Sequence, residues 1–180
     1  MNTYIALIRG INITGNHMLP MTELKRICEQ NNCLEVRTYI QSGNVIFRSA
    51  AADVELLAQR LTAGVSKSHG FEPRVLVITM RELEKAAAGN PFPEARENPK
   101  SLHLFFLTAK PKKPGLQKCE ALRAPSERFE LKGSIFYLHT PDGFGTSKLA
   151  KRAENLLGVG ATARNWRTVT TLLEMAKAPA

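Results

Sequence analysis

The chain has 180 residues, of which 43% are hydrophobic and 23% are charged, a balance typical of a globular protein and not of a disordered one. This length suits one ordinary core or two small subdomains. The formal net charge of +9 favours acidic partners such as nucleic acid, a phosphorylated small molecule or another anionic ligand.

No segment approaches the roughly 20 consecutive apolar residues that span a bilayer, and the first residues lack the pattern of a secretory signal. We therefore expect a soluble, cytoplasmic protein without a membrane partner. The three cysteines, Cys28, Cys33 and Cys119, cannot all pair within one chain and have no histidine cluster at zinc-site spacing. We predict no metal site.

The first part of the chain alternates short apolar runs with helical patterns. Pro20 precedes residues that recur at helical spacing, Asp53 is placed to cap a second helix, and Ser42 to Asn44 supply the positive-φ residues of a tight hairpin. The expected segments are strand 3–8, helix 21–31, strands 36–40 and 45–47, helix 54–65 and strand 74–78. This β-α-β-β-α-β order predicts a ferredoxin-like split βαβ unit, an antiparallel sheet with both helices on one face.

A second, less regular copy of the pattern follows. Thr79 and Glu82 form a capping box that opens a short helix, and residues 90–101, with three prolines, indicate a connecting loop. The further expected segments are strand 102–107, helix 115–122, a hairpin of 129–131 with 135–138, helix 147–157, a short strand within 158–163 and a last helix around 169–176. We therefore predict an α+β protein with a ferredoxin-like subdomain (1–78), a linker helix and loop (79–101) and a related, less regular α+β subdomain (102–180). One continuous α+β sheet is the alternative.

Two turn-rich segments predict a first candidate site. The first two strands of a ferredoxin-like unit run in the same direction, so the loop after the first strand and the hairpin tip lie at one end of the sheet. The polar residues brought together are Arg9, Asn12, Thr14 and Asn16 with Gln41, Ser42 and Asn44, and His17 lies in the same loop. Such a lining suits an anionic or carbonyl-bearing ligand. Glycine and asparagine are equally the usual residues of tight turns, so a structural role is the alternative.

Glycines precede the predicted helix that starts near Ser147. Free N–H groups at a helix start hold phosphate, and Lys148 adds positive charge. Residues 143–148 are not a P-loop, because the order Gly-Lys-Ser/Thr is absent, and they lack the third glycine of a dinucleotide fingerprint. We predict no cofactor, and an ordinary N-cap by Thr146 or Ser147 is the alternative to a phosphate site.

The single tryptophan, Trp166, lies between Arg164 and Arg167. An aromatic ring with flanking guanidinium groups can stack on a base and pair with phosphates, so this segment is a candidate nucleic-acid contact. Alternatively, Trp166 is buried, because it lies three residues before Val169 on the apolar face of the last helix. In that case the two arginines carry any anion contact.

Residue patterns typical of catalytic sites are scarce in the sequence. Ser42 lacks the first glycine of a nucleophile elbow, the histidines are scattered, and no pair of acidic residues stands out. His17 alone lies in a loop where general-base work is plausible. The catalytic residues therefore stay unknown.

Five segments together resemble the bacterial family known as domain of unknown function 1697: residues 6–12, 37–45, 90–92, 145–149 and 162–166. The resemblance covers almost the whole chain and implies an α+β protein with two subdomains, the first ferredoxin-like. It implies no established activity, substrate or catalytic residue. Family members often carry a second glycine and a basic residue after Asn12, whereas this chain has Thr14 to His17, which weakens a phosphate role for that loop.

Two functions of different classes remain. The first is a binding module for nucleic acid or another phosphate-rich ligand, which the charge, the glycine-led helix start and the segment of Arg164, Trp166 and Arg167 favour. The second is a small enzyme that acts on an anionic metabolite held between loop 9–16 and hairpin 41–44. The candidate ligand-binding residues are Arg9, Asn12, Asn16, His17, Gln41, Ser42, Asn44, Ser147, Lys148, Arg164 and Arg167. The sequence predicts no oligomeric state.

Overall fold

The computed structural model describes residues 1–178, and the chain forms two compact units. Residues 1–84 and the chain from Leu172 onward make the first unit, and residues 85–171 make the second. These limits differ from the predicted ones because helices α3 (Met80–Ala88) and α6 (Trp166–Lys177) each contribute residues to both units. The predicted α+β class with two similar units is confirmed.

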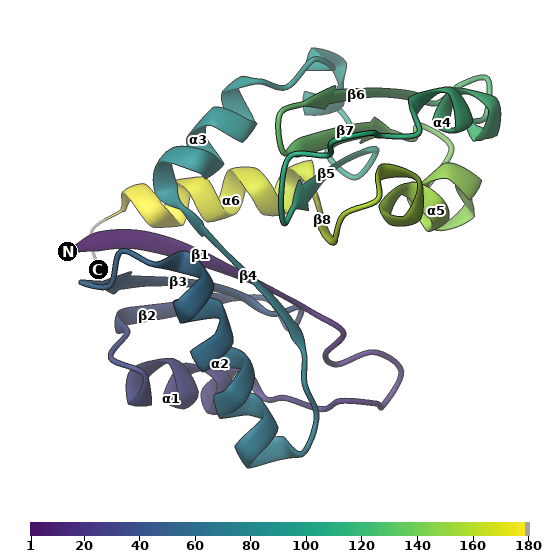
Figure 1. Ribbon diagram of the computed structural model, residues 1–180. Coiled ribbons are helices and arrows are strands. Elements are labelled where there is room, and N and C mark those ends of the chain that lie inside the picture. The colour runs from purple at the N-terminus through teal and green to yellow at the C-terminus, as the bar shows by residue number, and fades with distance from the viewer. Residues whose placement is uncertain (179–180) are drawn as a thin grey trace. The chain divides into compact units, whose positions relative to one another are not determined.

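The first unit has a four-stranded sheet of order β2-β3-β1-β4, in which every neighbouring pair is antiparallel. Its elements are β1 (Asn2–Arg9), α1 (Met21–Gln30), β2 (Leu34–Tyr39), β3 (Asn44–Ser49), α2 (Val54–His69) and β4 (Arg74–Thr79). Figure 1 shows α1 and α2 on the same face of this sheet. The predicted ferredoxin-like arrangement is therefore confirmed.

The limits of α2 follow from its sequence. Asp53 caps the start of the helix, because its carboxylate accepts hydrogen bonds from the N–H groups of Glu55 and Leu56, both at 3.0 Å. Gly70 ends the helix in the left-handed conformation, with a φ of 73°. The buried face of the helix consists of Leu57, Leu61 and Val65.

Strand β1 is buried on both faces. Tyr4, Ala6 and Ile8 pack in one core with residues of α1 and α2, while Ile5 and Leu7 on the opposite face are also fully buried. Burying an aliphatic side chain of this size contributes about 1.5–3 kcal/mol relative to leaving it exposed. The core therefore fixes the end of β1, from which the first candidate loop emerges.

The β2–β3 turn differs from the prediction in one detail. The residues with positive φ are Ile40 (49°) and Gly43 (74°), whereas Asn44 belongs to β3 and lies opposite Leu7. Gly43 is also required for space, because a Cβ atom there would come within 2.8 Å of the Ile8 side chain. The turn thus packs closely against the end of β1.

The second unit repeats the topology with the sheet order β6-β7-β5-β8, again antiparallel throughout. Its elements are the 3₁₀ helix η1 (Pro93–Arg96), β5 (Leu102–Leu107), α4 (Leu116–Leu122), β6 (Arg128–Lys132), β7 (Ile135–His139), the 3₁₀ helix η2 (Phe144–Thr146), α5 (Lys148–Leu157) and β8 (Ala161–Asn165). Its core includes Phe105 and Phe136 of the sheet with Leu149 and Leu157 of α5. Two separate sheets exclude the alternative of one continuous sheet.

The predicted capping box at the start of α3 is confirmed. The Glu82 carboxylate accepts a hydrogen bond from the N–H of Thr79 at 2.7 Å, and the Thr79 hydroxyl accepts one from the N–H of Glu82 at 3.2 Å. Of the helices within residues 1–178, none is long and apolar enough to cross a membrane.

Candidate functional site

The loop after β1 and the β2–β3 turn meet, as the strand directions predict. The N–H of Ile8 donates to the carbonyl oxygen of Gly43 at 2.8 Å, and the Asn12 side chain donates to the carbonyl oxygen of Gln41 at 2.9 Å. Two segments some 30 residues apart in the chain therefore form one surface at this end of the first sheet.

Two of the predicted ligand contacts in this surface hold the turns together instead. Asn12 also exchanges two hydrogen bonds with the backbone of Leu19, at 3.0 and 2.8 Å, so both of its amide hydrogens are in use. Asn44 is fully buried, and its amide donates to the Ser42 hydroxyl at 2.9 Å. The structure therefore gives Asn12 and Asn44 a structural role in the turns, because the turn geometry takes up their polar groups.

The remaining polar side chains of this surface are exposed. They are Arg9, Asn16, His17, Gln41 and Ser42. Arg9 lies directly opposite Arg74, which is also exposed, in the pairing of β1 with β4. Two basic residues, the last of β1 and the first of β4, thus lie beside the loop.

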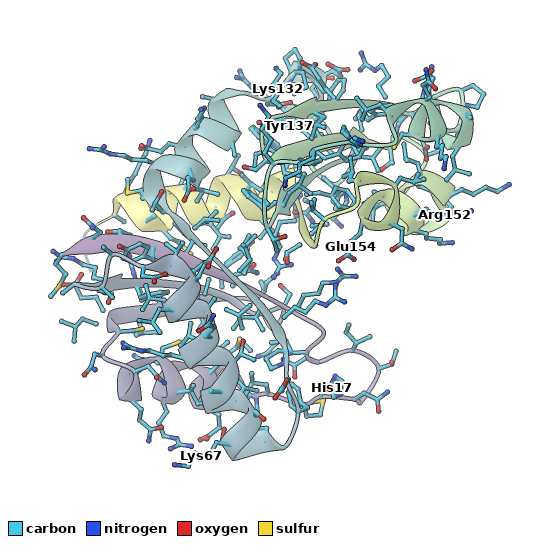
Figure 2. All side chains as sticks on the ribbon, in the orientation of Figure 1. His17, Lys67, Lys132, Tyr137, Arg152 and Glu154 are labelled. Atoms are coloured by element: carbon cyan, nitrogen blue, oxygen red, sulfur yellow. The ribbon has the colours of Figure 1, made fainter. Side chains whose placement is uncertain are left out.

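His17 has a defined ring orientation in this loop (Figure 2). Its Nδ1 lies 2.9 Å from the carbonyl oxygen of Gly10, and its ring stacks on Phe71 with 4.5 Å between the centroids. A carbonyl oxygen only accepts, so the neutral ring carries its proton on Nδ1 and presents a lone pair on Nε2. His17 also has a positive φ of 50°, a conformation that costs free energy and is concentrated at functional sites.

A second candidate site lies at the start of α5, the helix on which Figure 2 labels Arg152 and Glu154. Ser147 caps this helix, because its hydroxyl accepts the N–H of Ala150 at 3.0 Å. A pocket of about 290 Å³ opens beside the cap, and we name it the α5 pocket. Its polar lining residues are Arg123, Glu127, Asp142, Thr146, Ser147 and Lys148.

Most polar groups of the α5 pocket already have partners in the chain. The Arg123 guanidinium donates to the Glu120 carboxylate at 2.7 Å and to the backbone oxygen of Glu127 at 2.8 Å. Ser147 is 4% exposed and is engaged in the cap. Lys148 differs from them, because its exposed ammonium group forms no ion pair with any of residues 1–178.

Sequence reasoning singled out Thr146, Ser147 and Lys148 of the α5 pocket and missed three other polar residues, Arg123, Glu127 and Asp142. These three come from the end of α4, the turn before β6 and the loop after β7, and folding alone brings them together. The one available signal was Asp142, which precedes Gly143 in a turn dipeptide directly ahead of the glycine-led segment.

In the segment around the tryptophan, the structure shows a buried ring and not an exposed one. Trp166 opens α6 and is 8% exposed, which leaves little ring surface for a stacked base. Arg164 donates to the carbonyl oxygen of Ala163 at 2.9 Å, and Arg167 is exposed. Of the three candidates in this segment, Arg167 presents the most accessible side chain to an anion.

Comparison with known proteins identifies the family of the chain. The family model described as protein of unknown function (DUF1697) matches residues 1–137. The chain belongs to this family. A solved structure described as that of the conserved bacterial protein SP0830 from Streptococcus pneumoniae matches with a TM-score of 0.74 and 21% identity, covering 98% of this chain and 99% of that chain. At this identity the likeness shows a shared fold alone. The search of curated proteins gave no match.

Two further histidines of this DUF1697 protein lie in strands of the second unit. His103 stacks on Phe144 with 3.6 Å between the centroids, and burial lowers its pKa to about 4. Burial and the neighbouring Arg128 lower the pKa of His139. Both rings are neutral at pH 7. Within residues 1–178, no three His, Cys, Asp or Glu side chains are arranged to hold a metal ion.

Proposed function

We propose that this protein binds a small anionic ligand in the α5 pocket. The observation that carries the proposal is the position of Lys148. This residue is the first of α5 and lines the pocket, and its ammonium group is exposed without an ion-pair partner among the described residues. A ligand phosphate or carboxylate would supply the missing counter-charge.

Two physical effects support an anion at this position. The start of a helix carries roughly half a positive charge, which stabilises a nearby anion by about 0.3–1 kcal/mol. A lysine ammonium adds a full charge at the same place, and its three donors suit phosphate oxygens. The pocket volume of 290 Å³ lies at the small end of ligand sites and favours a small metabolite over a large cofactor.

A separate observation disfavours nucleic acid as the ligand. The burial of Trp166 removes the aromatic platform on which bases stack. We therefore favour a small anionic molecule within the class of anionic ligands that the sequence indicates.

Calorimetric titration with inorganic phosphate tests the proposal. We expect Lys148→Ala to weaken phosphate binding by tenfold or more, which corresponds to about 1.4 kcal/mol. The matched control is Lys151→Ala, which removes the same charge from an exposed position on the same helix outside the pocket lining. An equal loss in both variants would point to general electrostatic attraction and would contradict the proposal.

A second candidate function is a small enzyme that acts on an anionic metabolite beside His17. The specific observation in its favour is the hydrogen bond from His17 to the Gly10 carbonyl oxygen, which leaves Nε2 as the proton acceptor. Arg9 lies in the same exposed loop surface and would bind the anionic group. Protection of His17 from diethyl pyrocarbonate by a bound metabolite would support this candidate; equal modification with and without every metabolite of an anionic library would contradict it.

A further inference from the structure

The end of helix α1 brings two cysteines together. The N–H of Cys33 donates to the carbonyl oxygen of Cys28 at 3.1 Å, and the N–H of Asn32 donates to the carbonyl oxygen of Glu29 at 3.1 Å. Asn32 has a positive φ of 61°. These two hydrogen bonds around a left-handed residue form a Schellman motif, in which the residues at the positions of Cys28 and Cys33 commonly pack against each other.

The two thiols also interact with each other. A hydrogen bond between them raises the pKa of Cys28, which burial raises further, and the same bond lowers the pKa of Cys33. Both side chains belong to the core of the first unit, and both are free thiols. A disulfide joins Cα atoms that lie about 4.4–6.8 Å apart, and a direct backbone hydrogen bond between the two residues is compatible with that separation.

We infer that Cys28 and Cys33 are a modification site, at which hydrogen peroxide oxidises the two thiols to an intramolecular disulfide. The Cys33 thiolate attacks one oxygen of the peroxide, which breaks the O–O bond, leaves a sulfenic acid on Cys33 and releases hydroxide. The Cys28 sulfur then attacks the sulfenic sulfur, so that the S–S bond forms and a second hydroxide leaves. The two hydroxide ions take up the two thiol protons, and the peroxide is reduced to two molecules of water.

The place of the pair at a helix end gives the oxidant a route to it. Cys28 and Cys33 are 0% and 1% exposed, and thiols in a closed core are inert. The neighbouring Gln30 and Asn32 are exposed, however, and helix ends open locally more often than a whole protein unfolds. Cys119 is also fully buried, but it is the one cysteine of the second unit and has no second thiol with which to pair.

Peptide mass spectrometry of the whole chain, treated in its folded state with hydrogen peroxide, tests the inference. The remaining thiols are alkylated with N-ethylmaleimide in denaturant before digestion with trypsin. Trypsin cleaves after Arg26 and Arg37, so both cysteines fall in one peptide, 27–37. We expect this peptide to be lighter by two hydrogen atoms and to carry no N-ethylmaleimide. Treatment with dithiothreitol before alkylation should restore both alkylation sites.

Three variants provide the comparison. Cys28→Ala and Cys33→Ala each leave one thiol at the helix end, so neither variant should form a cross-link within peptide 27–37. Cys119→Ala is the matched control, because it removes a buried cysteine from the second unit, and it should form the cross-link as the wild type does. The wild-type measurement tests the inference by itself if a variant does not fold.

The possible results give a clear decision. A peptide 27–37 that keeps two alkylated thiols after exposure to peroxide overturns the inference. Oxidation of one cysteine to the sulfinic acid without a cross-link also overturns it, as does a disulfide formed mainly between two chains or with Cys119. A reversible cross-link within the peptide, in a protein whose Cys119 stays alkylated, supports it.

Discussion

The side chain of Asn12 donates a hydrogen bond to the carbonyl oxygen of Gln41 at 2.9 Å and so ties the loop after β1 to the β2–β3 turn. In the sequence both residues resemble parts of a ligand site. In the structure the bond is part of the scaffold, and it holds the exposed side chains of Arg9 and His17 on a surface of defined shape.

We predict that Asn12→Ala lowers the free energy of unfolding by about 2–4 kcal/mol, because it removes three hydrogen bonds of roughly 1 kcal/mol each. Urea denaturation measures the change. Asn16→Ala is the control and should change stability by less than about 0.5 kcal/mol, because the Asn16 side chain is exposed. A loss of anion binding in Asn12→Ala without a loss of stability would contradict the scaffold role.

The buried tryptophan gives a second prediction. Trp166→Ala should lower the free energy of unfolding by about 3–5 kcal/mol, as expected for truncation of a large buried aromatic side chain. Because the chain has one tryptophan, its fluorescence reports on this position alone. Single-stranded oligonucleotide should leave the emission of the wild-type protein unchanged. Quenching that salt reverses would contradict the assignment and would support nucleic-acid binding.

His103 makes stability depend on pH. Burial lowers its pKa to about 4 from the ordinary 6.5, so between these values the unfolded chain holds a proton that the folded chain does not. The free energy of unfolding therefore falls as the pH falls from 6.5 to 4, by up to about 3 kcal/mol from this residue.

Comparison with His103→Phe isolates the effect. The variant keeps a ring against Phe144, and His103 Nδ1 is buried without a hydrogen-bond partner among residues 1–178, so no bond of that atom is lost. Urea denaturation at pH values from 4 to 7 should show a weaker loss of stability toward acid in the variant than in the wild type. Equal slopes would show that His103 is protonated without penalty in the folded protein.

Two substitutions of Ser147 distinguish its role as a helix cap from a role in ligand binding. Ser147→Ala should lower the free energy of unfolding by about 1 kcal/mol, because the N–H of Ala150 loses its acceptor. Ser147→Asp keeps an acceptor at the cap and should preserve stability, yet it should weaken phosphate binding because it adds negative charge to the α5 pocket. Tighter phosphate binding in Ser147→Asp would contradict an anion site at this helix start.

Local sequence signals predicted much of the fold. Asp53 and the pair of Thr79 and Glu82 each satisfy N–H groups within a few residues, so their function depends only on local chain geometry. The strand order was also predictable, because the order β-α-β-β-α-β permits few arrangements. The chain repeats this order of strands and helices once, so both sheets have the same topology.

The candidate sites were less predictable, because the burial and the hydrogen-bond partners of a polar side chain depend on which residues folding places beside it. Asparagine is common in turns, but Asn44 is the first residue of β3 and is fully buried. Glu127 is one acid among many in the sequence, but in the structure it is buried and its carboxylate accepts the N–H of Ala124. Neither fact is encoded in the spacing of nearby residues.

The central claim is that an anion binds at the start of α5. The most direct test is a titration of the ¹⁵N-labelled protein with inorganic phosphate, followed through the backbone amide resonances. We predict saturable shifts concentrated in residues 142–150, largest at Lys148, that disappear in Lys148→Ala and persist in Lys151→Ala. Saturable shifts confined to the loop from Arg9 to His17, or no saturable shifts at any residue, would contradict the claim.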